Sequence, residues 1–454
     1  MATTAPFTVT VESLSPEGFG LAYRNQKSVY IYGALPGETV RVRVLKKRKG
    51  RLWCEVDPEP PSPHTPHQDA PGHLCTESEA PDLSQPPDPR IVQPLEDHYV
   101  SCSPWQRIRR DLHPKLKAGM LAAAFREAFG RDIPVTGFVD SKERTGYRTK
   151  IEYSFWYTSD LHLAFHVRGK PFVCTPVPEG CILASPAMNA VALAIRDQLR
   201  KHGIPKRSLK TLTIRESKTR NTRIALLCVQ EEEFSPPFRL ADIPRCAGLI
   251  IAYSDPRSPT SRIDTVLLAE GDGDLEEELR GVAIRYPIDG FFQNNVPVFT
   301  QALDAIADAI GTPERLVELY SGVGTIGMAL HDRAKEIIGV ELAAPNVEYA
   351  RRNAAVNGIT NYTVVAAPAE DTSAYALSPT DTVLLDPPRA GLHPTVIELL
   401  RTIKPRQIAY LSCNPITQAR DCALLQDVYA IKSLTGFDFY PGTMHLESLV
   451  ILIK

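Results

Sequence analysis

Residues 315–330, RLVELYSGVGTIGMAL, decide the fold of this 454-residue chain. The apolar run 315–320 predicts a strand, and the apolar residues that follow Gly322, Gly324 and Gly327 predict a helix. Glycines permit a tight turn and close approach of a ligand to the backbone, and the start of the helix offers unpaired amides. The spacing is weak by itself, but a strand before it and a helix after it favour a nucleotide-binding turn.

The same alternation continues to the end of the sequence. Strand-like apolar runs, separated by helical stretches, fall at 336–341, 362–366, 381–385, 407–412 and 449–453. Alternating helices and strands of this kind predict an α/β domain with a doubly wound, Rossmann-like parallel sheet. We expect this domain to occupy residues 286–454.

An acidic residue follows the glycine turn at a useful distance. The expected strand 336–341 within EIIGVEL ends at Glu341, where a carboxylate can accept hydrogen bonds from both hydroxyls of a ribose. Two ligands fit this pattern: a dinucleotide, or S-adenosylmethionine with its methionine end wrapped by Tyr320, Ser321 and Gly322. The third interpretation is a glycine turn beside a surface glutamate, with no ligand.

A rigid turn follows the strand 381–385 and bears on the choice of ligand. Asp386-Pro387-Pro388-Arg389 puts an acid and two prolines at the carboxyl edge of the sheet, where they form a fixed wall of a pocket. Methyltransferases that act on exocyclic amines have a similar Asp/Asn-Pro-Pro followed by an aromatic residue. Arg389 stands at that fourth position here, which disfavours amine methylation.

Two reactive side chains lie further along the chain. Cys413 follows the strand 407–412, beside the expected ligand crevice, where a thiol is well placed as a nucleophile. Glu447 precedes the last strand, and His445 lies two residues before it. The simpler interpretations are a small buried hydrophobe for Cys413 and a solvated loop acid for Glu447.

The amino-terminal residues 1–58 differ from the rest of the chain. Apolar residues alternate in period two between glycine turns, which predicts a small β-barrel of the OB or TRAM kind. Residues 41–51, RVRVLKKRKGR, hold seven basic residues and no acid. On such a barrel this stretch is as consistent with binding RNA phosphates as with a solvated strand. Eleven prolines between Asp57 and Pro94 predict a linker over 59–94.

Residues 95–285 predict a mixed α+β central domain. Helical periodicity covers 115–129 and 186–200, and strand-like runs cover 149–157, 161–167, 209–215 and 223–229. Nine basic residues and one acid lie in 200–223, whereas 270–278 holds six acids and no base. The net charge of −2 is therefore a sum of opposed patches, and it does not exclude a nucleic-acid partner.

Several classes of protein are disfavoured. No apolar run of about 18 residues predicts a membrane span, and MATTAPFTVT does not read as a signal peptide. Nine cysteines in a chain without a secretion signal predict reduced thiols, metal ligands or a catalytic nucleophile rather than a disulfide framework. We therefore expect a cytoplasmic protein, and we expect it to be a monomer.

Taken together, these residues resemble the RNA uracil-5-methyltransferases that use S-adenosylmethionine, and the resemblance covers most of the chain. The first 58 residues resemble the family's RNA-binding TRAM domain, which favours the branch that methylates 23S ribosomal RNA over the transfer RNA branch that lacks it. The catalytic half matches in five motifs, taken in order: Phe292-Gln293-Asn294-Asn295, the glycine turn, Asp386-Pro387-Pro388-Arg389, Ser412-Cys413-Asn414-Pro415 and Pro441-x-Thr443-x-His445-Leu446-Glu447.

The resemblance implies a mechanism that forms 5-methyluridine. Cys413 would add to carbon 6 of the uracil, carbon 5 would take the methyl group, and Glu447 would remove the proton from carbon 5. The target base would be unpaired or flipped out. The positions that match the family's cofactor contacts are Gln293, Tyr320, Gly322, Gly324, Glu341 and Asp386.

The chain departs from the family in two places. Many members carry a four-iron cluster on Cys-x5-Cys-x2-Cys and one distant cysteine, and this close triplet is missing here. We therefore expect no metal; the candidate ligands of a retained cluster are Cys75, Cys102 and Cys181, with Cys54 as a fourth. Pro368 also stands where an acid often contacts adenine, so backbone atoms or Glu370 would have to do so.

Other functions remain open at this point. The target could be a uridine of transfer RNA, or the chain could be a non-catalytic RNA-binding assembly factor that keeps the fold. Amine methylation of RNA or DNA is a further alternative. A dehydrogenase would need a hydride acceptor, for which the sequence has no motif. The sequence does not specify the uridine or the number of sites modified.

Overall fold

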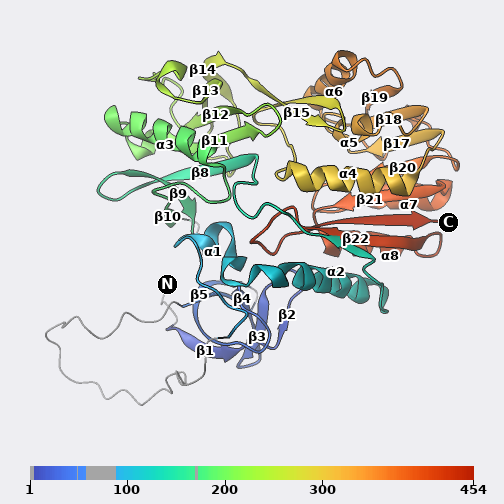
Figure 1. The fold of residues 1–454 in the computed structure, drawn as a ribbon, viewed down its shortest axis with the longest axis horizontal. Coiled ribbons are helices and arrows are strands. Elements are labelled where there is room, and N and C mark those ends of the chain that lie inside the picture. Colours follow the sequence, from blue (N-terminus) through green and yellow to red (C-terminus); the bar gives the residue numbers. More distant parts are fainter. Residues whose placement is uncertain (1–4, 49, 58–87, 169–171) are drawn as a thin grey trace.

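The computed structural model describes residues 5–48, 50–57, 88–168 and 172–454, and Figure 1 shows their arrangement. Their strands form sheets of six, seven, two and eight strands. The six-stranded sheet is amino-terminal, the seven-stranded sheet is central, and the eight-stranded sheet holds the carboxyl-terminal strands. Helix α2 (His113–Phe129) runs between the barrel and the eight-stranded sheet.

The amino-terminal sheet is the small barrel that the period-two pattern predicts. Its strands follow the order β1-β5-β6-β4-β3-β2, and every second residue of β1 is buried. Val29, Val42 and Cys54 are fully buried in its core. The strands are β1 (Phe7–Thr10), β2 (Ser13–Leu14), β3 (Gly20–Arg24), β4 (Lys27–Tyr32), β5 (Thr39–Arg48) and β6 (Arg51–Val56). Most of the expected linker, 58–87, lies outside the described residues.

The carboxyl-terminal sheet has the order β19-β18-β17-β20-β21-β23-β22-β7 and confirms the doubly wound α/β fold. Its first five strands are parallel, and β23 runs antiparallel between β21 and β22. These strands are β17 (Arg315–Leu319), β18 (Glu336–Glu341), β19 (Tyr362–Ala366), β20 (Thr382–Leu385), β21 (Gln407–Ser412), β22 (Ala430–Phe437) and β23 (Glu447–Ile453).

Helices cover both faces of this sheet. The helices α4 (Val296–Ile310), α5 (Thr325–Ala329) and α6 (Ala344–Val356) share one core with one face. The other face packs against α2, α7 (Pro394–Ile403) and α8 (Pro415–Leu424). Helix α5 has only five residues, so the glycine turn leads into a much shorter helix than its apolar pattern suggests.

The central sheet has the mixed α+β composition that the sequence predicts. Helix α3 (Pro186–Lys201) packs on it and matches the predicted helix at 186–200. Its strands are β8 (Lys150–Tyr157), β9 (Leu161–His166), β10 (Cys174–Pro176), β11 (Leu209–Ser217), β12 (Thr222–Val229), β13 (Gly248–Tyr253) and β14 (Thr265–Gly271).

Two segments expected in the central domain pack instead with the carboxyl-terminal sheet. Strand β7 (Gly137–Val139) pairs with β22, and Leu121 and Phe125 of α2 are buried against that sheet. The hairpin of β15 (Asp274–Leu279) and β16 (Val282–Pro287) shares its core with α4. Apolar faces decide these placements, whereas composition alone suggested divisions at 95 and 286.

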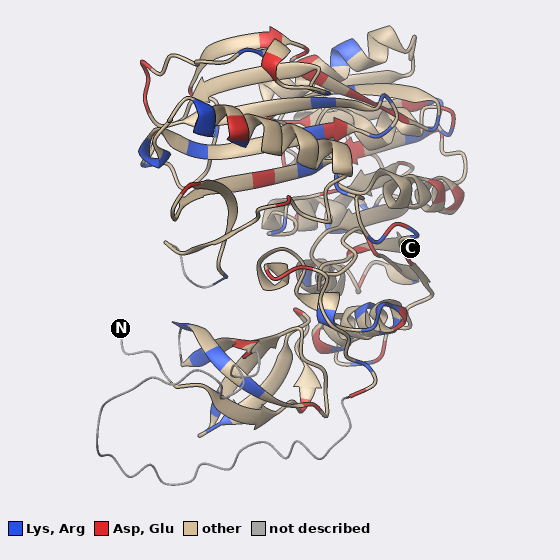
Figure 2. Cartoon of the chain, turned by 60° about the vertical axis from the view of Figure 1, so that its left-hand side comes forward, with Lys and Arg blue, Asp and Glu red and all other residues tan. Residues whose placement is uncertain are grey.

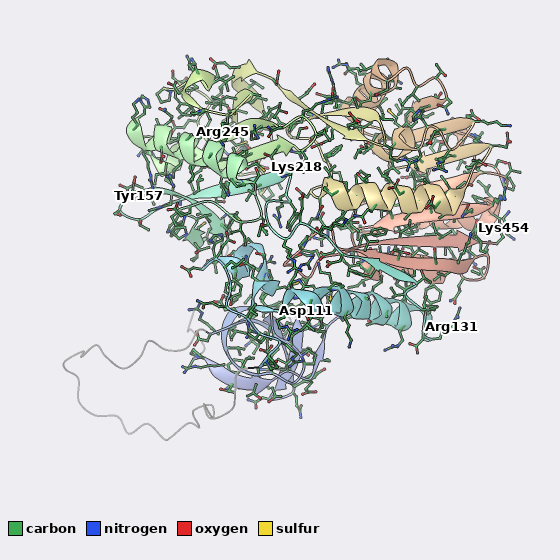
Figure 3. All side chains as sticks on the ribbon, in the orientation of Figure 1. Asp111, Arg131, Tyr157, Lys218, Arg245 and Lys454 are labelled. Atoms are coloured by element: carbon green, nitrogen blue, oxygen red, sulfur yellow. The ribbon has the colours of Figure 1, made fainter. Side chains whose placement is uncertain are left out.

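Some of the charged residues in these stretches form ion pairs in the structure. Within 200–223, Lys218 (labelled in Figure 3) and Arg223 both contact Glu216 at 2.7 and 3.2 Å. On the barrel, Arg43 pairs with Glu55, while Lys46 and Lys47 are exposed. Lys and Arg positions are visible along the strands of the barrel in Figure 2. The barrel therefore presents the positive charge of Lys46 and Lys47 at its surface.

None of the helices in the described part of the chain is long and apolar enough to span a membrane.

Candidate active site

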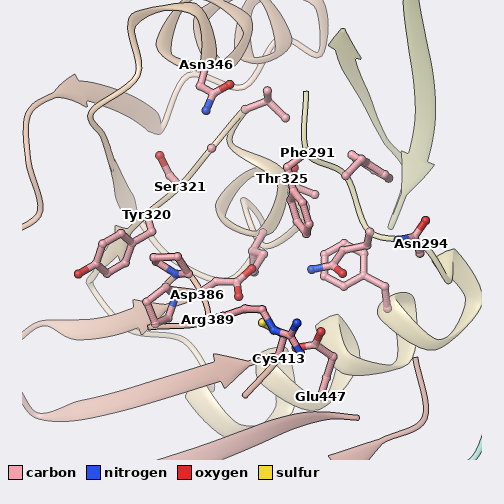
Figure 4. A pocket seen from close by; sticks show the side chains of 18 of the residues that line it. Phe291, Asn294, Tyr320, Ser321, Thr325, Asn346, Asp386, Arg389, Cys413 and Glu447 are labelled. Atoms are coloured by element: carbon pink, nitrogen blue, oxygen red, sulfur yellow. The ribbon is translucent and has the colours of Figure 1, made fainter. Parts of the chain in front are cut away.

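A cavity of about 530 Å³ opens at the carboxyl edge of the large sheet (Figure 4). Cys413, Glu447, Arg389 and Asp386 gather at one end, and Tyr320, Ser321 and Asn346 lie at the other. Six of the eight predicted site residues line this cavity: Gln293, Tyr320, Gly322, Asp386, Cys413 and Glu447. Gly324 lies in the same turn as Gly322, and Glu341 lies at the end of β18, where its carboxylate contacts Gly322.

The glycine turn has a strained backbone beside the cavity. Tyr320 has φ +66°, which is uncommon for a residue with a side chain, and Gly322 and Gly324 have φ +56° and +82°. A Cβ on Gly322 would meet nothing within 4 Å, whereas one on Gly324 would lie 2.4 Å from the methyl carbon of Met328. Gly324 therefore serves the packing of the turn, and Gly322 leaves open space on the side of the cavity.

The carboxylate of Glu341 accepts hydrogen bonds from the backbone at and near the glycine turn. Its Oε2 accepts a hydrogen bond from the amide of Gly322 at 3.0 Å, and its Oε1 accepts one from the amide of Ala343 at 2.8 Å. Asn346, which lines the cavity, donates to Oε1 at 3.4 Å. The carboxylate thus fixes the end of β18 against the turn, and its contact with a ribose remains a prediction.

Asp386 directly follows strand β20 and is half-buried. Burial raises the pKa of its carboxyl to about 7, so the group carries a proton for part of the neutral range. Pro387 and Pro388 then turn the chain along the wall of the cavity. The carbonyl of Arg389 accepts hydrogen bonds from Asn414 at 2.8 Å and from Thr417 at 3.2 Å, which ties this wall to the residues after Cys413.

Cys413 and Glu447 face each other from neighbouring antiparallel strands. Ser412 of β21 pairs with Ser448 of β23, so the next position of the register sets Cys413 across from Glu447. Cys413 is half-buried, and Glu447 is 2 % exposed.

Burial dominates the ionisation of both groups. Burial, followed by the charge of Glu447, raises the pKa of the Cys413 thiol to about 12, while Arg389 lowers it. Burial, followed by the charge of Asp386, raises the pKa of Glu447 well above its usual range, and Arg389 again opposes the shift. Arg389 is therefore the cation that favours the reactive form of each group.

A buried lysine holds the loop that carries Glu447. Lys117 of α2 is fully buried and contacts the carboxylate of Asp438 at 2.6 Å. It also donates to the carbonyls of Tyr440 at 3.1 Å and His445 at 2.7 Å. Burial lowers the pKa of Lys117, and Asp438 opposes this shift. The loop from 438 to 446 is therefore fixed by a helix that lies far away in the sequence.

Gln293 reaches the cavity from the loop that precedes α4. Its side chain is 5 % exposed, and its Oε1 has no hydrogen-bond partner among the described residues. The next turn is rigid, because Asn295 caps α4 by accepting from the amide of Val298. A buried amide oxygen without a partner fits a ligand that donates to it.

Sequence reasoning did not find several further lining residues, among them Arg148, Glu318, Asn346 and Tyr440. Glu318 lies within an apolar strand, and burial raises its pKa to about 8. The one sequence signal for Glu318 was that it is a single acid within an apolar run. Arg148 comes from the segment before β8, and nothing in the sequence links that segment to the glycine turn.

The adenine and cluster predictions have different outcomes. Pro368 and Glu370 do not line the main cavity, although Glu370 lines a neighbouring one that shares Tyr320. Cys102 and Cys181 lie together, Cys54 lies in the barrel core, and Cys75 falls outside the described residues. The described residues therefore do not gather four thiols, and they do not fit a four-iron cluster.

Comparison with known proteins supports the same assignment. Residues 272–454 match the tRNA (Uracil-5-)-methyltransferase family, and residues 6–53 match the TRAM domain. The chain is 27% identical over 469 residues to an uncharacterized RNA methyltransferase of Caldanaerobacter subterraneus, covering 98% of each chain. It is 26% identical over 461 residues to another of Lactobacillus johnsonii, covering 97% of each.

A solved structure has the same architecture. The Pyrococcus abyssi tRNA (uracil-54, C5)-methyltransferase, in complex with S-adenosyl-L-homocysteine, aligns with a TM-score of 0.73 at 20% sequence identity. The alignment covers 98% of this chain and 100% of that chain. Residues 272–454 match the tRNA (Uracil-5-)-methyltransferase family and residues 6–53 match the TRAM domain, while Gly322 leaves open space beside the cavity and Oε1 of Gln293 has no partner among the described residues; this chain is an S-adenosylmethionine-dependent RNA methyltransferase with an amino-terminal TRAM domain.

Proposed function

We propose that this enzyme methylates carbon 5 of a uridine in RNA through a covalent adduct between Cys413 and carbon 6. The observation that carries the proposal is the pair of Cys413 and Glu447, which face each other at the end of the cavity. A nucleophile and a base on the same side of a pocket are what this substitution requires.

The steps follow from these two groups. Carbon 5 of uracil is a weak nucleophile until the Cys413 thiolate adds to carbon 6 and leaves an enolate. S-adenosylmethionine, when bound, supplies an electrophilic methyl group on a sulfonium. Once carbon 5 is methylated, Glu447 removes the proton from that carbon, and elimination of the thiolate restores the ring and the enzyme.

The rest of the cavity supports the two ligands. Gln293, Tyr320, Gly322 and Asn346 would hold the methyl donor, with Glu341 and Gly324 shaping the turn. Asp386 would contact the uracil edge beside Cys413. A pocket of this kind accepts a base only when it is unpaired or flipped out of its helix.

The target we propose is 23S ribosomal RNA, with transfer RNA as the alternative. The resemblance of the barrel to the TRAM domain favours ribosomal RNA, because the family's transfer RNA branch lacks this domain. However, the Pyrococcus abyssi enzyme is a transfer RNA enzyme whose alignment extends over 98% of this chain. The barrel therefore supports an RNA substrate of either kind. We also propose that the enzyme works as a monomer in the cytoplasm, where RNA is made and thiols stay reduced.

The test compares ribosomal and transfer RNA from cells with and without the gene. Nucleoside mass analysis should detect 5-methyluridine that disappears from one RNA with the gene and returns with the wild-type chain. A chain carrying Cys413→Ala should fail to restore it. A methylated amine in place of 5-methyluridine would contradict the proposed reaction, and no methylated nucleoside at all would favour a non-catalytic assembly factor.

A further inference from the structure

A second group of reactive side chains lies outside the catalytic cavity. Glu96, His98, Cys102 and Cys181 each direct one ligand atom to a common point, and these atoms all lie within 4.8 Å of one another. His98 and Cys102 are 8 % exposed, Cys181 is 1 % exposed, and the Glu96 side chain is 7 % exposed. The proposed methylation reaction uses none of them.

Without a metal ion, the four side chains of this group form only weak hydrogen bonds with one another. The Sγ atoms of Cys102 and Cys181 lie 3.5 and 3.8 Å from Oε2 of Glu96, and thiols are weak donors. Nε2 of His98 lies 3.2 Å from Oε1 of Glu96, but no residue of the described ranges gives it a well-aligned hydrogen bond. A buried polar atom left in this way has lost its hydrogen bonds to water without a replacement, which is unfavourable.

We propose that these four residues bind one divalent zinc ion. Zinc takes thiolate, imidazole and carboxylate ligands at about 2.0–2.3 Å, and a tetrahedron of that size separates its ligand atoms by about 3.3–3.8 Å. The ligand atoms here all lie within 4.8 Å of one another, so small side-chain movements would complete the site. Four protein ligands leave no open position, which makes the site structural rather than catalytic.

The surroundings orient the ligands as a second layer of contacts does in metal sites. Oε1 of Glu96 accepts from the amide of Ile182 at 2.6 Å, and its Oε2 accepts from Gln106 at 3.1 Å. Ser103 lies 3.1 Å from the sulfur of Cys102. Two thiolates and a carboxylate exceed the charge of the ion by one, and the side chain of Arg148 shares the adjoining cavity.

This ligand set explains why the chain does not fit an iron–sulfur cluster. In the spacing Cys-x5-Cys-x2-Cys, Cys102 as the middle member would require cysteines at 96 and 105. The chain has Glu96 and Trp105 there, and Trp105 is fully buried in an apolar cluster with Met120 and Met444. A carboxylate and the nearby imidazole of His98 replace thiolates, which changes the site from one for a cluster to one for a single ion.

The proposed ion would join two distant segments. Helix α1 (Tyr99–Cys102) and the residues before it would be tied to the loop between β10 and α3, where Cys181 lies. This junction lines a cavity of about 400 Å³ that also contains Lys150, Arg168 and His445. His445 and Arg148 line the catalytic cavity as well, so the ion would stabilise a wall next to the active site.

The experiment measures metal in the full-length enzyme. The chain is produced in medium with zinc and iron, purified without oxygen, and assayed for zinc, iron and acid-labile sulfide. We expect about one zinc per chain, and less than a tenth of that in Cys102→Ser and in Cys181→Ser. The matched control is Cys246→Ser, a half-buried cysteine in the same domain that should keep the ion.

A second measurement covers the case in which the cysteine variants fail to fold. Wild-type enzyme stripped by a chelator is titrated with cobalt(II), which should give one equivalent of tetrahedral, thiolate-bound spectrum that zinc displaces. Absence of this spectrum, or zinc content equal in all variants, would overturn the proposal. About four irons and four sulfides per chain would also overturn it, in favour of a cluster.

Discussion

Cys413 and Glu447 flank the last pair of the antiparallel ladder of β21 and β23, because Cys413 follows Ser412 and Glu447 precedes its partner Ser448. Both side chains end in the same cavity, with Arg389 beside them. Burial favours the neutral form of the thiol and of the carboxyl, and Arg389 opposes it in each case. Both groups therefore favour the neutral form before ligands bind. We expect the reaction to start when bound ligands supply positive charge and exclude water.

Replacing Arg389 should move the activity to higher pH. Because Arg389 lowers the pKa of both Cys413 and Glu447, Arg389→Gln should raise both pKa values and reduce the reactive forms at neutral pH. We expect kcat/KM at pH 7 to fall about tenfold or more, which corresponds to about 1.4 kcal/mol, with partial recovery at pH 9. The control is Arg401→Gln, a surface arginine paired with Asp427. An unchanged pH profile would contradict this role.

Replacing Glu447 should make the protein more stable at alkaline pH. A carboxyl whose pKa is raised by folding keeps its proton in the folded state and loses it when unfolded, so stability falls as pH rises from about 4.5 toward the folded pKa. Glu447→Gln removes this loss. Urea unfolding should show the variant more stable than wild type at pH 8 by on the order of 1–3 kcal/mol, with little difference at pH 4.5.

The exposed Glu398→Gln serves as the control, because its carboxylate stays in water on α7. The idea fails if Glu447→Gln is less stable than wild type at pH 8, since that would mean the ionised carboxylate is well solvated or paired.

Replacing Gln293 should weaken binding of the methyl donor without affecting RNA. Its unpartnered Oε1 lines the cavity, and a hydrogen bond to a charged donor contributes about 1.5–3 kcal/mol. Gln293→Ala should therefore raise the dissociation constant of S-adenosylmethionine about ten- to a hundredfold in calorimetry. Gln301→Ala, at an exposed position on α4, should leave it unchanged. Equal binding by Gln293→Ala would remove this residue from the donor site.

Replacing Lys117 should loosen the loop that carries Glu447. Lys117→Met leaves Asp438 without this partner and should cost about 3–5 kcal/mol of stability, as the loss of one member of a buried ion pair does. Because the carbonyls of Tyr440 and His445 also lose a donor, kcat should fall more than KM changes. Lys115→Met on the exposed face of the same helix is the control. A change in KM alone would argue against a positioning role.

Local sequence patterns were enough to predict many of the strands and the glycine turn of this protein. The strand, glycine turn and following strand place Tyr320, Gly322 and Glu341 because each lies within a few residues of a regular element. The register of the last strand was not predictable in this way. Strand β22 was not predicted, and without it the position of Glu447 relative to Cys413 follows only from the resemblance.

Long-range contacts account for what sequence reasoning missed. Lys117 reaches Asp438 across 321 positions, and Glu96 meets Cys181 across 85. Nothing local distinguishes these side chains from solvated ones. The basic stretch 200–223 shows the opposite error in part, because four of its nine basic side chains pair with acids in the folded chain.

The central claim concerns the covalent step, and one measurement tests it most directly. Glu447→Gln is mixed with S-adenosylmethionine and the RNA substrate, and the mixture is separated under denaturing conditions. The account predicts a stable protein–RNA adduct that carries the methyl group, because Cys413 adds to the base but the proton on carbon 5 is not removed. The double variant with Cys413→Ala should form none. Full methyl transfer by Cys413→Ala alone, without an adduct, would contradict the account.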